Sequence, residues 1–423
     1  MALLLMTAPA LAQPPRPERP YRGLFGSGVG DADQLLTASG SIFGGYDDNV
    51  YADMLGDSGA VTQGGASAGT VAGASGSLAY SFRTEPITFG MSLGSSTRYY
   101  PDTGDDLVTA TQGGLTLTAS PRLGTSLSLG LLAAYQPYQL TPLFHVDFEP
   151  QPGDSLIPDL DLVTTVDSYL RYAGRLGFSQ RVSRQMTFSA NYGYQHADRG
   201  AEADEFRYQS LGGTLTYNLG KGLDARAGYS YGEGDYGDGG TREHHAIDAG
   251  VNYNRALSIS RQTTLSFSTG TSALRTRDDL RFTLTGNARL QHEIGRSWNT
   301  WVGYARRVLM NETFPEPVVA DSASAGLRGL ISRRMQFTSS IRGALGKQGL
   351  ESDAPGFNTA QGAATLSYAL TRFMNLGVTY FYYRQRFDDG AVLSIGVPAS
   401  AQRHSVRATV SLWAPVFERT RRD

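Results

Sequence analysis

The sequence predicts an all-β protein, and within that class a transmembrane antiparallel β-barrel of about 18 strands, with 16 as the alternative count. Three observations predict it. Apolar and polar side chains alternate along most of the chain, and short connections take turns with long ones. The composition joins 51 glycines, 23 tyrosines and 18 phenylalanines to a complete absence of cysteine. Such a mixture is typical of strands with one lipid-facing and one water-facing side.

The alternation begins near Leu36 and persists to the last strand. In one segment Met186, Phe188, Ala190, Tyr192 and Tyr194 alternate with polar or small residues, and in another Phe282, Leu284, Gly286, Ala288 and Leu290 do so. A period of two places successive side chains on opposite faces of a strand. Helical spacing is not sustained anywhere, so the sequence predicts strands with two different faces.

The connections are of two kinds, and their order predicts the hairpins. Short, often arginine-containing turns lie near residues 83, 121, 183, 221, 261, 296, 333 and 372. Longer polar loops are expected at Pro101 to Leu107, Ala197 to Glu205, Glu233 to Thr241, Asn311 to Val319, Lys347 to Gly356 and Phe387 to Ala391. Short turns at one end and long loops at the other are typical of outer-membrane barrels. Eight such turns predict 18 strands.

The predicted strands have the following starting points. They begin near Leu36, Ala66, Ile87, Val108, Ser126, Asp167, Met186, Phe206, Leu223, His244, Thr263, Arg281, Trp298, Asp321, Met335, Phe357, Met374 and Arg403. One insertion, Pro137 to Thr165, interrupts the rhythm and is rich in proline and aspartate. Loops of this length are usually functional or disordered. The sequence leaves open whether it forms a constriction or plug in the pore or an external loop.

Composition excludes several functional classes. Without cysteine there is no disulfide framework, thiolate nucleophile or cysteine-based metal site. The formal net charge of -2 argues against a strongly basic nucleic-acid binder. Among the 37 basic residues only Lys221 and Lys347 are lysine, which leaves 37 − 2 = 35 arginines. Arginine suits phosphate and carboxylate contacts, but a GC-rich genome is the favoured explanation of the bias.

The sequence divides into a barrel with short flanking segments. Residues 1–12 are predicted to be a signal peptide, because a short apolar run ends in Ala10-Leu11-Ala12, an A-x-A cleavage pattern. The basic segment that usually precedes such a run is missing, so we expect the signal peptide to be truncated. Residues 13–35 are expected to form an extended arm, residues 36–417 the barrel, and residues 418–423 a tail.

The faces of the strands predict how the barrel meets lipid. Every backbone group must pair in a bilayer, so the sheet must close, with apolar side chains outward and small polar ones inward. Six tyrosines near the loop ends of their strands are expected to form an aromatic girdle: Tyr192, Tyr194, Tyr229, Tyr231, Tyr380 and Tyr382. A barrel of 18 strands is too wide for side chains to fill and encloses a channel unless something plugs it.

The inward register predicts a charged lumen. The candidate pore-lining residues are Arg171, Arg175, Arg226, Arg289, Arg328, Arg342, Arg407, Asp224 and Asp248. An excess of arginine would favour anionic solutes or an anionic polymer. The alternative is that these arginines pair with lumen carboxylates and brace the wall.

A short motif adds a resemblance to a known family. The segment GYDDNVYAD, Gly45 to Asp53, carries a Tyr-x-Asp-Asn element at the tip of the first strand. In this element and in its strand count the chain resembles the β-barrel porin type 2 family of outer-membrane proteins. That resemblance implies an outer-membrane pore, often linked to exopolysaccharide systems, and carries over only Tyr46, Asp48 and Asn49. The chain departs from many such barrels in continuing past Phe417.

The sequence offers little chemistry. His244 and His245 lie on opposite faces of a strand, so they are poorly placed to share a metal ion. Asp235, Asp238 and Glu243 form a loop that is more readily a solvated acidic surface than a calcium site. Gly26 to Gly30 opens no helix, so no phosphate loop is supported. We therefore predict no catalytic residue, no metal site and no cofactor.

The leading functional prediction is a porin-like channel of the bacterial outer membrane, not an enzyme, that passes small polar solutes or serves polysaccharide export. The alternatives are a barrel enzyme acting at the outer rim and a non-conducting structural or assembly barrel. The expected partners are outer-membrane lipid and lipopolysaccharide, the barrel assembly machinery and polysaccharide export components, with no nucleic acid.

Overall fold

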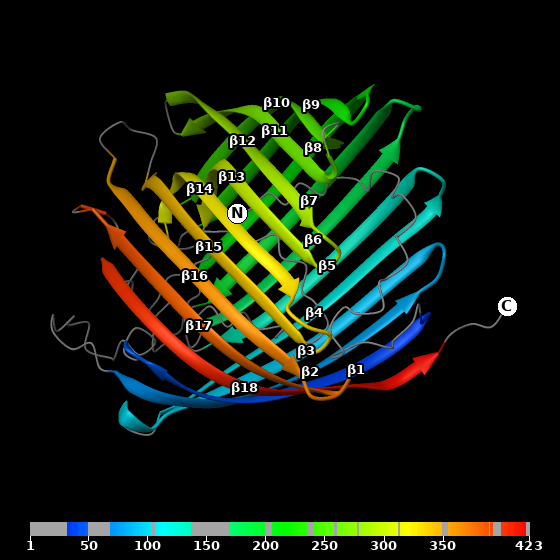
Figure 1. The fold of residues 1–423 in the computed structure, drawn as a ribbon. Helices are drawn as coiled ribbons and strands as arrows, with labels where there is room; N and C mark the ends of the chain where they lie inside the picture. The colour runs from blue at the N-terminus through cyan, green and yellow to red at the C-terminus, as the bar shows by residue number, and fades with distance from the viewer. Residues whose placement is uncertain are drawn as a thin grey trace.

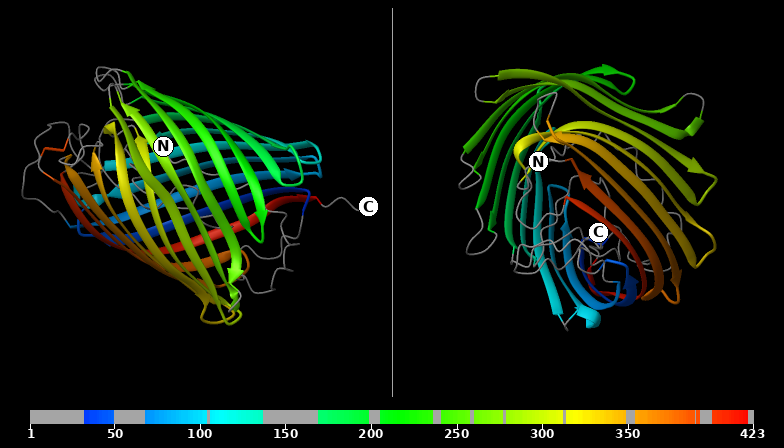
Figure 2. Two further views of the ribbon diagram at one scale, coloured as in Figure 1. Left: turned by 90° about the horizontal axis from the view of Figure 1, so that it is seen from above. Right: turned by 90° about the vertical axis from the view of Figure 1, so that its left-hand side faces the viewer.

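A computed structural model describes residues 32–49, 68–103, 106–136, 169–198, 205–235, 241–257, 260–276, 279–311, 314–348, 354–388, 390–391 and 399–419. These residues form one 18-stranded antiparallel sheet that closes on itself (Figures 1 and 2). The predicted fold class and strand count are therefore confirmed. The signal peptide, the arm up to residue 31 and the insertion Pro137 to Thr165 lie outside the described residues.

The strands are long and nearly uniform. The first nine are β1 (Gln34–Asp47), β2 (Gly69–Arg83), β3 (Ile87–Tyr100), β4 (Asp106–Arg122), β5 (Thr125–Gln136), β6 (Tyr169–Arg181), β7 (Met186–Asp198), β8 (Phe206–Gly220) and β9 (Leu223–Asp235). The other nine are β10 (Thr241–Leu257), β11 (Ser260–Thr276), β12 (Asp279–Ile294), β13 (Trp298–Asn311), β14 (Phe314–Leu330), β15 (Met335–Gln348), β16 (Gly356–Ala369), β17 (Met374–Phe387) and β18 (Ser400–Arg419). A short 3-10 turn, η2 (Pro101–Thr103), follows β3. No helix in the described part of the chain is long and apolar enough to cross a membrane.

Closure comes from the pairing of the first and last strands. Each strand pairs with its neighbours in the chain, and β1 also pairs with β18 from Gln34↔Arg419 to Asp47↔Ser405. In Figure 1 these two strands lie side by side as the blue and red ends of the colour scale. Because no edge is left over, the sheet satisfies its own backbone groups, as a lipid environment demands.

The two ends of the barrel differ in their connections, as predicted. Tight turns join β2 to β3, β4 to β5 and β8 to β9 at one end, which we call the turn end; the opposite end is the loop end. In the β8–β9 hairpin only Lys221 and Gly222 separate the strands, and both have positive φ, 54° and 79°. Two successive positive φ angles define the type I′ turn that matches strand twist, which explains glycine here.

One predicted loop is wrong in its extent. The segment Asn311 to Val319 was expected to be a long loop, but β13 continues to Asn311 and β14 begins at Phe314. Pro315 and Pro317 therefore belong to a strand. Proline is tolerated at the first residues of a strand, and the ladder here is irregular, with a register shift between Leu309 and Asn311. This hairpin is longer than the sequence pattern indicates.

Alternation along the strands separates an outer from an inner face. The outer face carries exposed large apolar residues such as Ile42, Leu93, Leu176, Leu284 and Ile341. The predicted girdle tyrosines share this face: Tyr192, Tyr194, Tyr229 and Tyr380 are exposed, whereas Tyr231 and Tyr382 are half-buried. Since a continuous apolar exterior is stable only against lipid, the wall is built to span a membrane.

Candidate functional site

The candidate site is the inner wall of the barrel. All nine predicted pore-lining residues belong to the inward register of their strands. The assignment follows from their neighbours: Arg175 precedes exposed Leu176, Asp248 follows exposed Ile247, and Arg342 follows exposed Ile341. The same rule assigns the other six to the inward face: Arg171 on β6, Asp224 and Arg226 on β9, Arg289 on β12, Arg328 on β14 and Arg407 on β18. That they line a water-filled pore stays a prediction.

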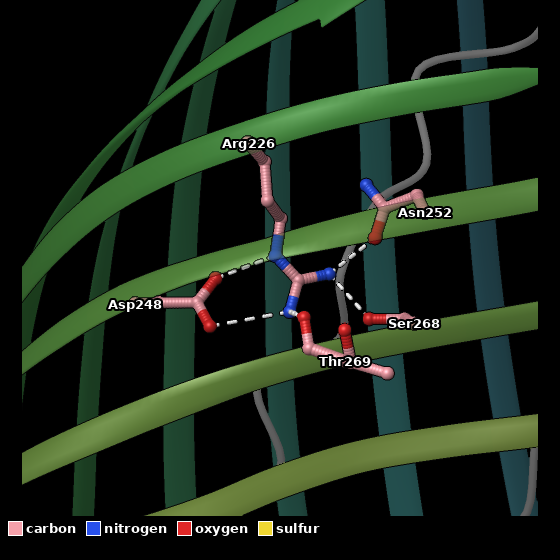
Figure 3. A network of polar contacts seen from close by, with 5 residues as sticks. All are labelled: Arg226, Asp248, Asn252, Ser268 and Thr269. Carbon is pink, nitrogen blue, oxygen red and sulfur yellow. Dashed lines mark hydrogen bonds and ion pairs between the residues drawn. The ribbon is translucent and has the colours of Figure 1, made fainter.

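Arg226 is the centre of a polar network that spans three strands (Figure 3). Its Nε donates to Asp248 Oδ2 at 2.5 Å and its Nη2 to Asp248 Oδ1 at 3.2 Å. Nη1 donates to Asn252 Oδ1 and Ser268 Oγ, and Nη2 also reaches the carbonyl oxygen of Thr269 at 3.3 Å. The guanidinium thus ties β9 to β10 and β11, and its charge is compensated by Asp248.

A glycine makes room for this network. A Cβ at Gly270 would lie 2.1 Å from Asp248 Oδ1 and 3.0 Å from Arg226 Nη2. Any larger residue at this position of β11 would displace the carboxylate from its guanidinium. The other predicted acidic residue of this region, Asp224, accepts a hydrogen bond from Asn218 Nδ2 at 2.7 Å. Arg226 and Asp248 therefore match the bracing alternative that the sequence left open.

A second ion pair lies at the seam where the barrel closes. Arg403 on β18 and Asp47 on β1 are 2 % and 0 % exposed, and Arg403 Nη2 lies 2.6 Å from Asp47 Oδ2. Close by, Arg407 donates from Nε to Ser405 Oγ at 3.2 Å, and its guanidinium lies 5.4 Å from the Phe43 ring centre. Sequence reasoning missed Arg403, although the alternation that gives Arg407 also gives the residue four positions earlier.

The Tyr-x-Asp-Asn element acts at this same seam. Asp48 Oδ1 accepts a hydrogen bond from the backbone N–H of His404 at 2.6 Å, and Asn49 Nδ2 donates to the carbonyl oxygen of Gln402 at 2.8 Å. Asn49 N–H in turn donates to Asp47 Oδ1 at 3.1 Å. The motif therefore fastens the end of β1 to the start of β18.

Three predicted arginines remain without such partners. In the described part of the chain, Arg171 and Arg175 on β6 and Arg289 on β12 form no ion pair, and Nε of both Arg171 and Arg289 is buried without a hydrogen-bond partner. Arg171 and Arg175 lie four residues apart on one strand and on one face. We call Arg171, Arg175 and Arg289 the unpaired arginines. They leave uncompensated positive charge on the inner wall.

The inner face at the loop end differs from the sequence prediction. Small hydrophilic residues were expected throughout, but this end carries a buried inward-facing set that we call the collar: Val71, Tyr100, Phe206, Tyr208, Val318, Phe357, Phe381, Tyr383 and Phe387. All are at most 7 % exposed, whereas inward residues at the turn end, such as Ser81, Arg83 and Asn218, are exposed. The inner wall is therefore packed at the loop end and accessible at the turn end.

On β17 the collar escaped prediction because the strand does not alternate in hydrophobicity. Residues Tyr380 to Tyr383 read Tyr-Phe-Tyr-Tyr, so aromatic side chains occupy both faces of β17. This unbroken aromatic run is the signal that could have indicated the collar residues of β17. Within the collar, Phe357 and Phe387 lie 5.8 Å apart between ring centres.

The histidines supply no metal centre in the described residues. His245 points outward, where its Nδ1 lies 2.6 Å from the hydroxyl of Tyr229. The described residues contain no group of three or more His, Cys, Asp or Glu side chains arranged to hold a metal ion. Gly26 to Gly30 and Asp238 lie outside the described residues.

The closed sheet, the apolar exterior and the polar inner wall decide the broad class. The chain is an outer-membrane β-barrel. No family model matches the sequence, and no curated protein matches it either. Solved structures resemble it only distantly.

Three of these structures come from Pseudomonas aeruginosa. OpdQ is 15 % identical over 91 % of this chain and 98 % of its own, with a TM-score of 0.44. OccK2 (OpdF) in complex with glucuronate is 13 % identical over 91 % and 99 %, with a TM-score of 0.45. The siderophore receptor PirA is 11 % identical over 90 % and 80 %, with a TM-score of 0.43. Likeness of this degree transfers neither a substrate nor a site, so function must be argued from the chain itself.

Proposed function

We propose that the protein is an outer-membrane channel whose lumen favours anionic solutes, and that an acidic polysaccharide on its way out of the cell is one cargo that the wall suits. One observation carries the proposal. Among the residues that the structure describes, Arg171, Arg175 and Arg289 on the inner wall have no carboxylate partner, whereas Asp248 and Asp47 pair with Arg226 and Arg403.

The physical argument concerns charge in a confined lumen. A guanidinium always carries its proton, and it offers paired N–H donors that match carboxylate, sulfate or phosphate groups. A lumen lined by one sign of charge raises the local concentration of counter-ions and repels co-ions. Two arginines on β6 and one on β12, six strands further around the sheet, present that charge from separated parts of the wall.

The packing of the two ends supports a gated channel more than a permanently open one. The collar residues at the loop end are buried, and inward residues at the turn end are exposed. Short turns of outer-membrane barrels lie on the periplasmic side. A solute arriving from the periplasm would therefore meet accessible wall first and the packed collar last, which fits export.

The same collar supports the second candidate, a non-conducting structural barrel. A barrel whose inward residues are buried at the loop end need never open, and Arg226 and Arg403 are inward arginines that form ion pairs between strands. No described arrangement of side chains specifically favours the third candidate, an enzyme at the outer rim.

Conductance across a planar bilayer separates these candidates. The test variant is Arg171→Gln/Arg175→Gln/Arg289→Gln. The control is Arg207→Gln/Arg306→Gln/Arg372→Gln, which removes the same charge from residues outside the inner register. Both are measured in the native background and with Tyr383→Ala, which thins the collar.

We expect anion preference, read as the reversal potential in a potassium chloride gradient, to fall in the test variant and to survive in the control. Equal preference in both variants would contradict the role of the unpaired arginines. A folded protein that stays silent in both backgrounds would contradict a channel and support the structural barrel.

A further inference from the structure

Along the outer face of β17 the side chains change from aliphatic to aromatic to basic toward the loop end. Its outward side chains run from Leu376 and Val378 through Tyr380 and Tyr382 to Arg384 and then Arg386. Apolar residues are stable against acyl chains, tyrosine at the interface, and arginine at the level of the headgroups. The two arginines therefore lie just beyond the aromatic girdle at the loop end, the extracellular side of such barrels.

Both side chains point out of the barrel. They alternate with Tyr383, Gln385 and Phe387, which face inward and are 2 %, 6 % and 5 % exposed, whereas Arg384 and Arg386 are exposed. Two residues on one strand lie roughly 7 Å apart. This spacing lets two guanidiniums approach a single phosphate group or two neighbouring ones.

The residues opposite the pair on β16 and β18 carry no charge. Arg384 is opposite Gln402 on β18 and Ala360 on β16, and Arg386 is opposite Ser400 and Asn358. No described residue forms an ion pair with either arginine. The two flanking strands therefore present uncharged residues to the pair, and the amide and hydroxyl groups among them can add hydrogen bonds to an anion.

Two nearby carboxylates, Asp48 and Asp388, keep their negative charge but bond to backbone amides and form no ion pair with either arginine. Asp48 accepts the backbone N–H of His404 at 2.6 Å, and Asp388 Oδ2 accepts the backbone N–H of Gly356 at 3.0 Å. His404 itself is held by the aromatic girdle, with Nδ1 2.7 Å from the hydroxyl of Tyr380 and its ring 4.8 Å from that of Tyr382. The exposed Arg384 and Arg386 thus lie next to aromatic side chains that these contacts hold in place.

Two other outward arginines near the loop end form ion pairs. Arg207 pairs with Glu205, and Arg306 pairs with Asp321 at 3.0 Å, where Tyr304 also donates to Asp321 at 2.5 Å. Halfway around the sheet, the rim of β9 and β10 is acidic, with Glu233 and Glu243 in the outward register. Among the outward arginines near the loop end whose side chains the structure describes, the two on β17 are therefore those without an ion pair.

We propose that Arg384 and Arg386 form a binding site for the phosphate groups of an outer-leaflet lipid, with Gln402 and Ser400 as supporting hydrogen-bond donors. Arginine binds phosphate through paired, charge-assisted hydrogen bonds. At the depth of these two arginines, the anionic groups that surround the barrel are those of the lipid headgroups. Phosphorylated lipopolysaccharide, already predicted from the sequence as a partner, has the required chemistry. This site is independent of whether the barrel conducts.

Lipid binding to the purified protein in detergent tests the site. The probes are lipopolysaccharide with its lipid phosphates intact, the same preparation after chemical dephosphorylation, and inorganic phosphate. The test variant is Arg384→Gln/Arg386→Gln, and the matched control is Arg207→Gln/Arg306→Gln, which removes two outward but paired arginines. Heat-modified mobility on gels confirms that every variant is a folded barrel.

We expect the test variant to bind intact lipopolysaccharide more weakly by about tenfold or more, because it loses the charge-assisted hydrogen bonds of both guanidiniums to phosphate. The control should bind as the native protein does, and dephosphorylated lipid should bind the native protein no better than it binds the test variant. Equal affinity of native protein and test variant would overturn the proposal. So would equal losses in both variants, or saturation by inorganic phosphate alone, which would indicate a soluble anion as the ligand.

Discussion

Arg403 Nη2 lies 2.6 Å from Asp47 Oδ2, and this buried ion pair joins the last strand of the barrel to the first across 356 residues of sequence. The two strands lie at opposite ends of the barrel sequence, and their pairing closes the wall. This ion pair, together with the hydrogen bonds from Asp48 and Asn49 to the backbone of β18, stabilises the closed barrel and its register. Burial of both charges makes each dependent on the other.

Removing one member of this pair is expected to destabilise the barrel strongly. Asp47→Asn or Arg403→Gln leaves a buried charge without its partner, and we expect a loss of about 3–5 kcal/mol in the free energy of unfolding. Urea unfolding followed by tryptophan fluorescence measures it. Arg306→Gln, which breaks a half-exposed pair, should cost less than about 1 kcal/mol. Similar losses at both sites would show that the seam pair has no special role.

A glycine next to this pair gives a sharper test of the seam. A Cβ at Gly45 would lie 2.3 Å from the carbonyl oxygen of Val406 and 2.9 Å from Cγ of Arg407, whereas one at Gly44 would meet nothing within 4 Å. We expect Gly45→Ala to destabilise the barrel by about 1–3 kcal/mol through overpacking. Gly44→Ala should be nearly neutral. Indistinguishable unfolding curves for the two variants would mean that β1 and β18 are less closely packed than described.

The fold was predictable from sequence because its signals are local. A period of two is visible within one strand. The residue types at Ser183-Arg184 and Gly220-Lys221-Gly222 indicate turns. The same alternation assigns Arg226 and Asp248 to one face. It does not pair them, since their contact depends on the register of β9 against β10, which is set by the whole ladder.

Contacts across the seam and within the collar lay beyond local signals. Asp47 and Arg403 are brought together only by closure, which no segment of the sequence encodes alone. Phe381 and Tyr383 were missed because the rule that apolar residues face lipid fails where both faces are aromatic. The extent of β14 was missed because Pro315 and Pro317 weigh against a strand in isolation, but not at an irregular hairpin end.

The compensation of Arg226 by Asp248 predicts an increase in anion preference when the acid is removed. Asp248→Asn retains the shape of the side chain but frees one guanidinium charge on the inner wall. We expect a larger anion preference in bilayer recordings together with lower stability, because the network across β9, β10 and β11 loses its charge-assisted bonds. An unchanged reversal potential in an open channel would place Arg226 away from the conduction path. Asp321→Asn, on the outer face, is the matched control.

Asp102 in η2 predicts a pH effect at the loop end. The backbone N–H and the hydroxyl of Thr70 donate to Asp102 Oδ2 at 2.6 and 2.8 Å, and these bonds hold the pKa of the Asp102 carboxyl below its ordinary value of 3.8. The contact therefore stabilises the fold above about pH 3.8 and is lost as the pH falls through the lowered pKa. Thr70→Val removes one donor and should raise the pKa of Asp102, measured by carbon-13 NMR titration of labelled aspartate. Thr84→Val, at the turn end, should leave that titration unchanged.

Thinning the collar is expected to increase conductance. Tyr383 is 2 % exposed and faces inward at the loop end, where its hydroxyl donates to Gln385 Oε1 at 2.6 Å. Tyr383→Ala removes a buried aromatic ring from the packed end of the lumen, so single-channel steps should become larger or more frequent. Tyr380→Ala removes the same side chain from the outer face of the same strand and should leave conductance unchanged. If both variants conduct like the native protein, the collar does not limit passage, and the resistance lies elsewhere in the lumen.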